Sequence, residues 1–165
     1  MVRAIASLLF LMFGALSASA QSPFQVAGFR YEVGSSGMHF YSCVAPSCGI
    51  NTASFEYQDG PQDAGLAQFE DTMRAAFNVM APAGSQVEIA GRAKVISSGK
   101  LRVWTMAARI SHQSRQPNYV VGGFITGGVR RLSLISGGSS LGGAQQNFEA
   151  FARKLKPIIL KGSPL

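Results

Sequence analysis

The clearest hydrophobic pattern in the chain lies in residues 100–136, where three runs rich in Val, Ile, Leu, Phe, Tyr and Trp follow one another. We predict that these runs form consecutive β-strands over Lys100–Ile110, Asn118–Thr126 and Val129–Ser136. The polar segment Ser111–Pro117 separates the first two runs, and Gly127-Gly128, a dipeptide typical of hairpin turns, separates the last two. Neither face of the first run is purely polar, which indicates a central strand with both faces covered.

Two other segments carry apolar residues at helical spacings of three and four. The first stripe is Leu66, Phe69, Met73, Phe77 and Met80, and the second is Leu141, Ala144, Phe148, Phe151, Ala152 and Leu155. We expect the first helix to start at Asp59-Gly60-Pro61 and to end near Ala81-Pro82. We expect the second to be capped by Ser139 or Ser140 and to stop at Pro157, which leaves residues 158–165 as a frayed tail.

Further runs with strand character are Phe24–Val33, Met38–Cys43, Ser54–Tyr57 and Gln86–Ser97. Gly91, inside the last of these runs, indicates a bulge or a close approach of another backbone. The order along the chain is therefore three strands, a helix, four strands and a helix. It predicts an α+β fold in which two amphipathic helices cover an antiparallel β-meander sheet, an α/β sandwich.

The first twenty residues have the pattern of a secretory signal peptide. Arg3 supplies the positive start, Ile5–Leu16 is a short apolar core, and Ala18-Ser19-Ala20 is a small-residue cleavage site. The apolar run is shorter than the roughly 18 residues that span a membrane, although an uncleaved N-terminal anchor is an alternative. We expect cleavage after Ala20, a periplasmic or secreted product, and a single domain over residues 21–157.

Cys43 and Cys48 are the two cysteines of the chain. In an oxidising compartment we expect them to form a disulfide that closes a small loop. Their spacing is C-x4-C, which differs from the C-x-x-C of redox centres, so a structural bond is favoured over a catalytic pair.

The net charge differs sharply between the two halves of the chain. Without Arg3, fourteen basic and eight acidic residues remain, a net charge of +6. Residues 21–89 hold two basic and seven acidic residues, a net charge of −5, whereas residues 90–165 hold twelve basic residues and one acidic residue, a net charge of +11. Such a gradient can attract an anionic partner, or it can simply draw the two halves together.

Basic and aromatic residues of the predicted sheet are the first candidate for a binding surface. The candidate residues are Arg92, Lys94, Arg102, Trp104, Arg109, Arg130 and Arg131. They occur on both strand parities, so they either form a contact surface or hold the acidic first helix against the sheet. For an exported protein we expect the partner to be an envelope protein, a glycan or an anionic lipid surface, and we do not expect nucleic acid.

The segment Gly137–Gly143 is the second candidate, because backbone N–H groups at a helix start can hold an anion. Gly137, Gly138 and Ser139 would contribute most directly. The segment lacks the lysine of a phosphate-binding loop, so a plain turn between a strand and a helix is the alternative.

No catalytic constellation is recognised in the sequence. His39 and His112 have no acidic neighbours, and no ligand spacing typical of a metal site is present. We therefore predict a non-enzymatic binding or accessory protein of the cell envelope without a metal or another cofactor. The alternatives are a small-molecule or anion binder, or a hydrolase, with a cleft between the first helix and the sheet, and a secreted factor that acts on a host or neighbouring cell.

The run GGFITGGVRRLSLISGGSSLGGAQQNFEAFARKLK ends the meander and forms the last helix. With the two flanking helices, this order of elements resembles the PsbP-like α/β/α sandwich group of small exported proteins over roughly residues 55–157. The resemblance implies an accessory or binding module and gives no catalytic residue. The loop between the two cysteines is a departure from the group.

Overall fold

The structure is a computed structural model that describes residues 22–34, 36–48, 51–59, 65–127 and 130–161. The predicted signal peptide, the Gly127-Gly128 turn and the last four residues of the predicted tail therefore lie wholly or partly outside the described residues. Within those ranges, no helix is long and apolar enough to cross a membrane.

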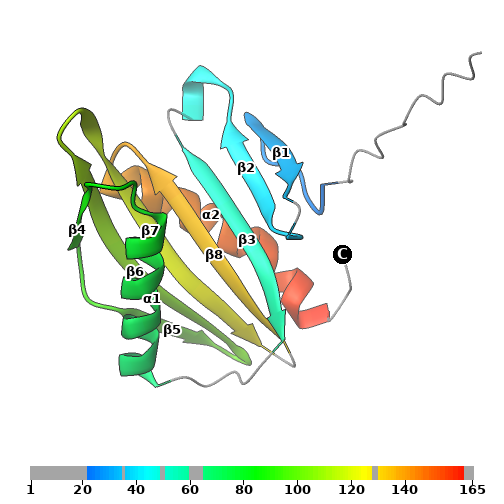
Figure 1. Ribbon diagram of the computed structural model, residues 1–165. Helices are drawn as coiled ribbons and strands as arrows, with labels where there is room; N and C mark the ends of the chain where they lie inside the picture. Colours follow the sequence, from blue (N-terminus) through cyan, green and yellow to red (C-terminus); the bar gives the residue numbers. More distant parts are fainter. Residues whose placement is uncertain (1–21, 35, 49–50, 60–64, 128–129, 162–165) are drawn as a thin grey trace, which may run out of the picture.

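The described residues form an α+β fold with one eight-stranded antiparallel sheet and two long helices (Figure 1). The strands are β1 (Phe29–Val33), β2 (His39–Cys43), β3 (Thr52–Asp59), β4 (Gln86–Ile89), β5 (Lys94–Ser98), β6 (Leu101–His112), β7 (Arg115–Gly127) and β8 (Arg130–Gly138). The helices are α1 (Leu66–Met80) and α2 (Leu141–Lys161), with a short 3-10 helix, η1 (Pro46–Cys48). The predicted α+β sandwich is confirmed.

The sheet consists of two antiparallel meanders joined side by side. Its strand order is β1-β2-β3-β8-β7-β6-β4, and β5 also pairs with β6. The two meanders meet where Phe55 of β3 lies opposite Leu134 of β8. Because β6 pairs with β7 on one side and with β4 and β5 on the other, it is the central strand that its mixed faces predict.

Helix α2 covers one face of the sheet and supplies most of the core (Figure 1). Its residues Phe148, Phe151 and Leu155 are buried against Leu132 and Leu134 of β8 and their neighbours. The ring of Phe151 also meets Tyr41 edge-on at 4.9 Å between centroids. The apolar stripe predicted from the sequence is therefore the face that α2 buries.

Helix α1 covers only part of the opposite face. Its buried residues Phe69, Met73 and Phe77 pack over Trp104 of β6 and Phe124 of β7. Elsewhere on this face side chains remain open to solvent, and Phe40 of β2 is 39% exposed. This uneven cover leaves room for a cavity beside α1.

The prediction of a loop over Ser111–Pro117 is wrong. Strand β6 continues to His112 and β7 begins at Arg115, so only Gln113 and Ser114 form the turn. The segment is polar because this end of the hairpin is exposed, and polarity alone did not distinguish an exposed strand end from a loop.

The single strand predicted over Gln86–Ser97 is two strands, β4 and β5, separated at residues 90–93. Both pair with β6, and the backbone of Ala90 still donates to Ala107 at 2.9 Å. Gly91 lies in this break between two strands, and a Cβ atom there would meet nothing within 4 Å, so the predicted bulge or close approach of another backbone is wrong. Likewise, the first strand begins at Phe29 rather than Phe24, because Gly28 turns the chain with a φ of 81°.

Helix α1 starts later than predicted and α2 ends later than predicted, whereas α1 ends at Met80, next to the predicted Ala81. Strand β3 extends to Asp59, so α1 begins only at Leu66, with Gly65 at its N-cap. The prediction that Pro157 ends α2 is also wrong, since the helix continues to Lys161 and buries Ile159. Burial of this extra turn compensates for the hydrogen bond that Pro157 cannot donate. The predicted cap is confirmed at Ser140, whose Oγ accepts from the Gly143 N–H at 3.1 Å.

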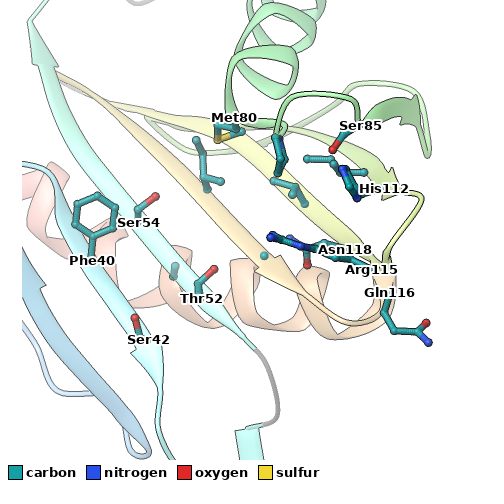
Figure 2. Close-up of a pocket in the computed structure, with 16 residues that line it drawn as sticks. Phe40, Ser42, Thr52, Ser54, Met80, Ser85, His112, Arg115, Gln116 and Asn118 are labelled. Carbon is teal, nitrogen blue, oxygen red and sulfur yellow. The ribbon is translucent and has the colours of Figure 1, made fainter.

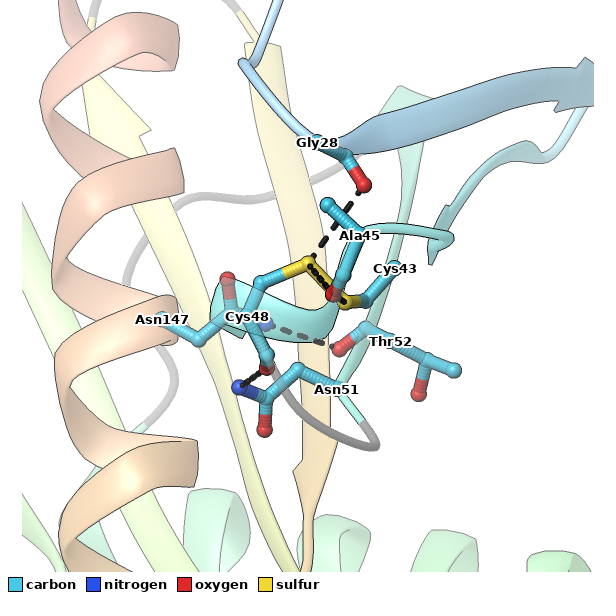
Figure 3. The surroundings of a disulfide bond; sticks show 7 residues. All are labelled: Gly28, Cys43, Ala45, Cys48, Asn51, Thr52 and Asn147. Atoms are coloured by element: carbon cyan, nitrogen blue, oxygen red, sulfur yellow. Dashed lines mark hydrogen bonds between the residues drawn. A yellow bond between two sulfur atoms is a disulfide. The ribbon is translucent and has the colours of Figure 1, made fainter.

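The predicted Cys43–Cys48 disulfide is present, with a distance of 5.9 Å between the two Cα atoms (Figure 3). It closes the η1 turn against the carbonyl of Gly28, which accepts from the Val44 N–H at 2.8 Å. Nearby, the buried side chain of Asn147 on α2 donates to Thr52 O at 3.0 Å and to Ser136 Oγ at 2.8 Å. The η1 turn thus lies next to a polar contact that ties α2 to β3 and β8.

Candidate functional site

The basic residues predicted as one surface lie on different sides of the sheet. Cross-strand pairs share a face, so Lys94, which pairs with Thr105, lies on the α2 side, as does Arg109. Arg102 and Arg131 lie on the α1 side, where each pairs with Thr126 of β7 from one of its two neighbouring strands. A single basic face therefore does not form.

Trp104 is a core residue rather than part of a contact surface. It is 8% exposed, and its ring lies 5.6 Å from that of Phe69 on α1. The burial explains why an aromatic residue occurs between two arginines on this strand: alternate positions face the core under α1.

Arg131 and Arg109 have partners within the sheet. The guanidinium of Arg131 lies 4.5 Å from the centroid of the Phe124 ring and donates to Gln58 Oε1 at 2.7 Å. Arg109 contacts Glu88 on β4 at 3.5 Å, with both side chains partly exposed, so this ion pair contributes little to stability. Arg102 is exposed on β6, and the side chain of Arg130 lies outside the described residues.

The predicted anion-binding loop at Gly137–Gly143 is largely regular structure. Gly137 and Gly138 belong to β8 and pair with Val120 and Tyr119 of β7. Only Ser139 and Ser140 connect the strand to α2, and Ser140 is occupied as the helix cap. The backbone N–H groups of the two glycines are therefore part of a strand and not of a phosphate-type cradle.

Two of the predicted basic residues, Arg92 and Lys94, instead line the same groove as two cations of helix α2. Together with Arg153 and Lys156 they line a groove of about 500 Å³ between α2 and the edge strand β5. We call this feature the basic groove. Glu149 is the acidic residue among the side chains that line it.

The floor of the basic groove is mostly apolar. It contains Val103, Thr105 and Ala107 of β6, Val121 of β7, and Phe148 and Ala152 of α2. Ile96 of β5 stands at the rim and is 60% exposed. The groove therefore combines an apolar floor with a cationic rim.

One half of the basic groove has a signal in the sequence, in the spacing of charged residues on α2. Arg153 and Lys156 follow Glu149 at helical spacing, which places all three along one flank of α2, beside its buried stripe. Cations near the end of a helix also suit its dipole, so this spacing alone does not indicate a groove. The other half has no such signal, because the position of β5 across from this flank depends on how the sheet is ordered.

A second cavity, of about 480 Å³, lies on the opposite face beside the C-terminal end of α1 (Figure 2). It is bounded by Phe40 and Thr52 on one side, His112 and Asn118 on the other, and Met80 above. We call this cavity the α1 cleft. Its position matches the cleft between the first helix and the sheet that the sequence left open as an alternative.

His39, one of the two histidines considered for catalysis, is a packed side chain. Its ring stacks on Phe55 at 4.5 Å between centroids, and its Nδ1 lies 2.8 Å from the hydroxyl of Tyr31. Burial lowers the pKa of His39 below its ordinary value of 6.5 and raises the pKa of Tyr31. Among the residues that the structure describes, no three His, Cys, Asp or Glu side chains gather in a way that could hold a metal ion.

No family model and no curated protein matches the chain. Among solved structures, the chain is similar to cyanobacterial PsbP (CyanoP) from Synechocystis sp. PCC 6803. The TM-score is 0.49 and the identity 11%, over 83% of this chain and 96% of that chain. The predicted resemblance to the PsbP-like group is thus confirmed as a weak likeness of fold, and it carries no argument about function.

Proposed function

We propose that this chain is an exported, non-enzymatic binding protein of the cell envelope whose basic groove holds an anionic lipid. The observation that carries the proposal is the grouping of Arg92, Lys94, Arg153 and Lys156 around an apolar floor. Four cations against Glu149 alone make the groove attractive to an anionic headgroup.

The apolar part of the groove favours a lipid over the other anionic partners that the sequence allowed. A glycan presents hydroxyl groups that would leave Ile96, which is 60% exposed at the rim, without an apolar contact. An acyl chain would cover this side chain, at roughly 0.8 kcal/mol for each buried CH₂ group. The volume of the groove, about 500 Å³, is within the usual range of small-ligand sites.

Export is supported by two features of the chain. The first twenty residues have the composition of a cleavable signal peptide. The Cys43–Cys48 disulfide is of a kind that persists in oxidising compartments such as the periplasm or the extracellular medium.

Co-sedimentation with vesicles tests the proposal. Vesicles of phosphatidylcholine alone are compared with vesicles in which roughly one lipid in three is anionic phosphatidylglycerol. We expect the chain to bind the anionic vesicles and to release them at high salt. The Arg153→Gln/Lys156→Gln variant should bind about thirtyfold more weakly, since each cation near an anionic surface contributes about 1 kcal/mol.

The matched control is Lys154→Gln/Lys161→Gln, which removes the same charge from exposed positions of α2 outside the groove. It should retain most of the binding. An equal loss in both variants would mean that only the net charge of the chain matters. That result, or binding of an acidic peptide without binding of vesicles, would overturn the proposal.

A further inference from the structure

The α1 cleft shares no lining residue with the basic groove and lies on the other face of the sheet. The end of α1 and the following turn cover it on one side, and strands β2, β3, β6, β7 and β8 supply the rest. It does not depend on the function proposed above. Its lining side chains point to a ligand of a different kind.

A glycine opens the floor of the α1 cleft. Gly137 of β8 lies between Thr52 of β3 and Val120 of β7 in the ladder. A Cβ atom at Gly137 would lie 3.0 Å from Thr52 Oγ1 and 3.6 Å from Asn118 Nδ2. The missing side chain therefore leaves a space that a hydroxyl and an amide border from opposite sides.

Two further polar groups border the cleft on the side of the α1 turn. The Oγ of Ser85 is buried and has no hydrogen-bond partner among the residues that the structure describes. The Nδ1 of His112 accepts from the Ser114 backbone N–H at 3.3 Å, which leaves Nε2 as the ring nitrogen that carries a hydrogen atom. This Nε2 atom lies beside Gly84, which belongs to the same turn as Ser85. Both side chains line the cleft and carry hydrogen-bond donors.

The charge of the cleft is positive. Arg115, at the start of β7, lies beside Asn118 on the hairpin side of the cavity (Figure 2). No Asp or Glu occurs among the described side chains that line it. The cleft thus offers one guanidinium, several hydroxyls and an amide, a set of donors that matches the oxygens of one carboxylate better than the greater charge of a phosphate.

Apolar side chains form the remaining wall of the cleft. Ile110 and Val120 are buried at its base, whereas Phe40 and Met80 are 39% and 40% exposed at its edge. A ligand in the cleft would cover these two large apolar side chains. The apolar wall and the polar side thus face the two ends of an amphipathic small molecule.

We propose that the α1 cleft binds a small monocarboxylic acid with an aromatic or branched apolar body. The carboxylate lies toward Arg115 and Asn118, with Thr52 within reach, and the apolar body lies against Phe40 and Met80. The chain would then be a carrier or sensor of such an acid, in addition to its lipid-binding groove.

Isothermal titration calorimetry with 3-phenylpropanoate tests the site. The neutral 3-phenylpropanamide and inorganic phosphate serve as comparison ligands. We expect the acid to bind at least about tenfold more tightly than the amide, and phosphate not to bind. Arg115 is exposed, so Arg115→Gln should not impair folding. We expect this variant to bind the acid about tenfold more weakly and to bind the amide with unchanged affinity.

A steric variant and a spectroscopic readout locate the ligand. Gly137→Ala should lower the affinity for both the acid and the amide, because the new methyl group occupies the floor of the cleft between Thr52 and Asn118. In a ¹H–¹⁵N spectrum the side-chain amide signals of Asn118 should shift when the acid is added. Lys156→Gln, in the basic groove, should change neither the affinity nor these shifts.

Three results would overturn the inference: no binding of the acid by the wild-type chain, equal binding of acid and amide, or binding that Lys156→Gln abolishes and Arg115→Gln does not. The last of these would assign the acid to the basic groove. Loss of vesicle binding with intact binding of the acid would overturn the proposed function alone, so the two proposals fail separately.

Discussion

At the scale of single residues, His39 gives the fold a sensitivity to acid. Its ring lies between Phe55 and Tyr31, and burial lowers its pKa below the ordinary 6.5 of an unfolded chain. The unfolded state therefore takes up a proton at a higher pH than the folded state does. It follows that the contribution of His39 to the free energy of unfolding is fully present above about pH 6.5 and is lost as the pH falls toward the folded pKa.

We expect the free energy of unfolding, measured by urea titration, to fall between neutral and mildly acidic pH. The His39→Gln variant should lose most of this pH dependence in the same range. The His112→Gln variant keeps His39 and serves as the comparison variant. A wild-type curve that is flat with pH, or a pH dependence that His39→Gln leaves intact, would contradict the assignment.

At the scale of elements, the sequence predicted which segments form helices and strands better than it predicted where they end. The apolar stripes were sufficient to predict both helices, because their buried residues follow the helical period. These residues are Phe69, Met73 and Phe77 in α1, and Phe148 and Phe151 in α2. The ends depend on tertiary contacts. Helix α2 passes Pro157 because Ile159 is buried by the rest of the fold, and no local pattern contains that information.

The disulfide acts on one small element, the turn that contains η1. The bonded residues are five positions apart, so the bond closes a short loop and restricts the unfolded chain only modestly. We expect Cys43→Ser/Cys48→Ser to lower the free energy of unfolding by about 2 kcal/mol. Reduction of the wild-type chain should have a similar effect. Urea denaturation measures both.

The turn keeps other contacts when the bond is removed. The carbonyl of Gly28 still accepts from Val44, and the backbone of Cys43 donates to Asn51 O at 2.9 Å. We therefore expect the circular dichroism spectrum of the double variant to match the wild type. Complete unfolding of the variant would show that the disulfide is required for the fold itself, contrary to this expectation.

At the scale of the whole molecule, the number of charged residues can be read from the sequence, but the positions of these residues on the fold can be read only in part. Twelve basic residues follow position 89 in the sequence. In the structure, Arg102 and Arg131 lie on the α1 side of the sheet, whereas Lys94 and Arg109 lie on the α2 side. Parity along each strand already indicated this division. The grouping of Arg92 and Lys94 with Arg153 and Lys156 needed the order of strands and the position of α2, which arise from contacts distant in the sequence.

The arrangement of the two cavities on opposite faces predicts that they bind their ligands independently. The basic groove and the α1 cleft share no lining residue, and the packed sheet separates them. Equilibrium dialysis of 3-phenylpropanoate should therefore give a dissociation constant that changes by less than about twofold when anionic vesicles saturate the chain.

Strand β7 is the element that could break this independence, because Val120 lines the cleft and Val121 lines the groove. Competition between acid and vesicles would mean that both ligands occupy one site. A tighter binding of the acid in the presence of vesicles would mean instead that occupation of the groove shifts β7 and reshapes the cleft. Either result contradicts independence. The Arg115→Gln variant separates the two, since it weakens only a ligand that is bound in the cleft.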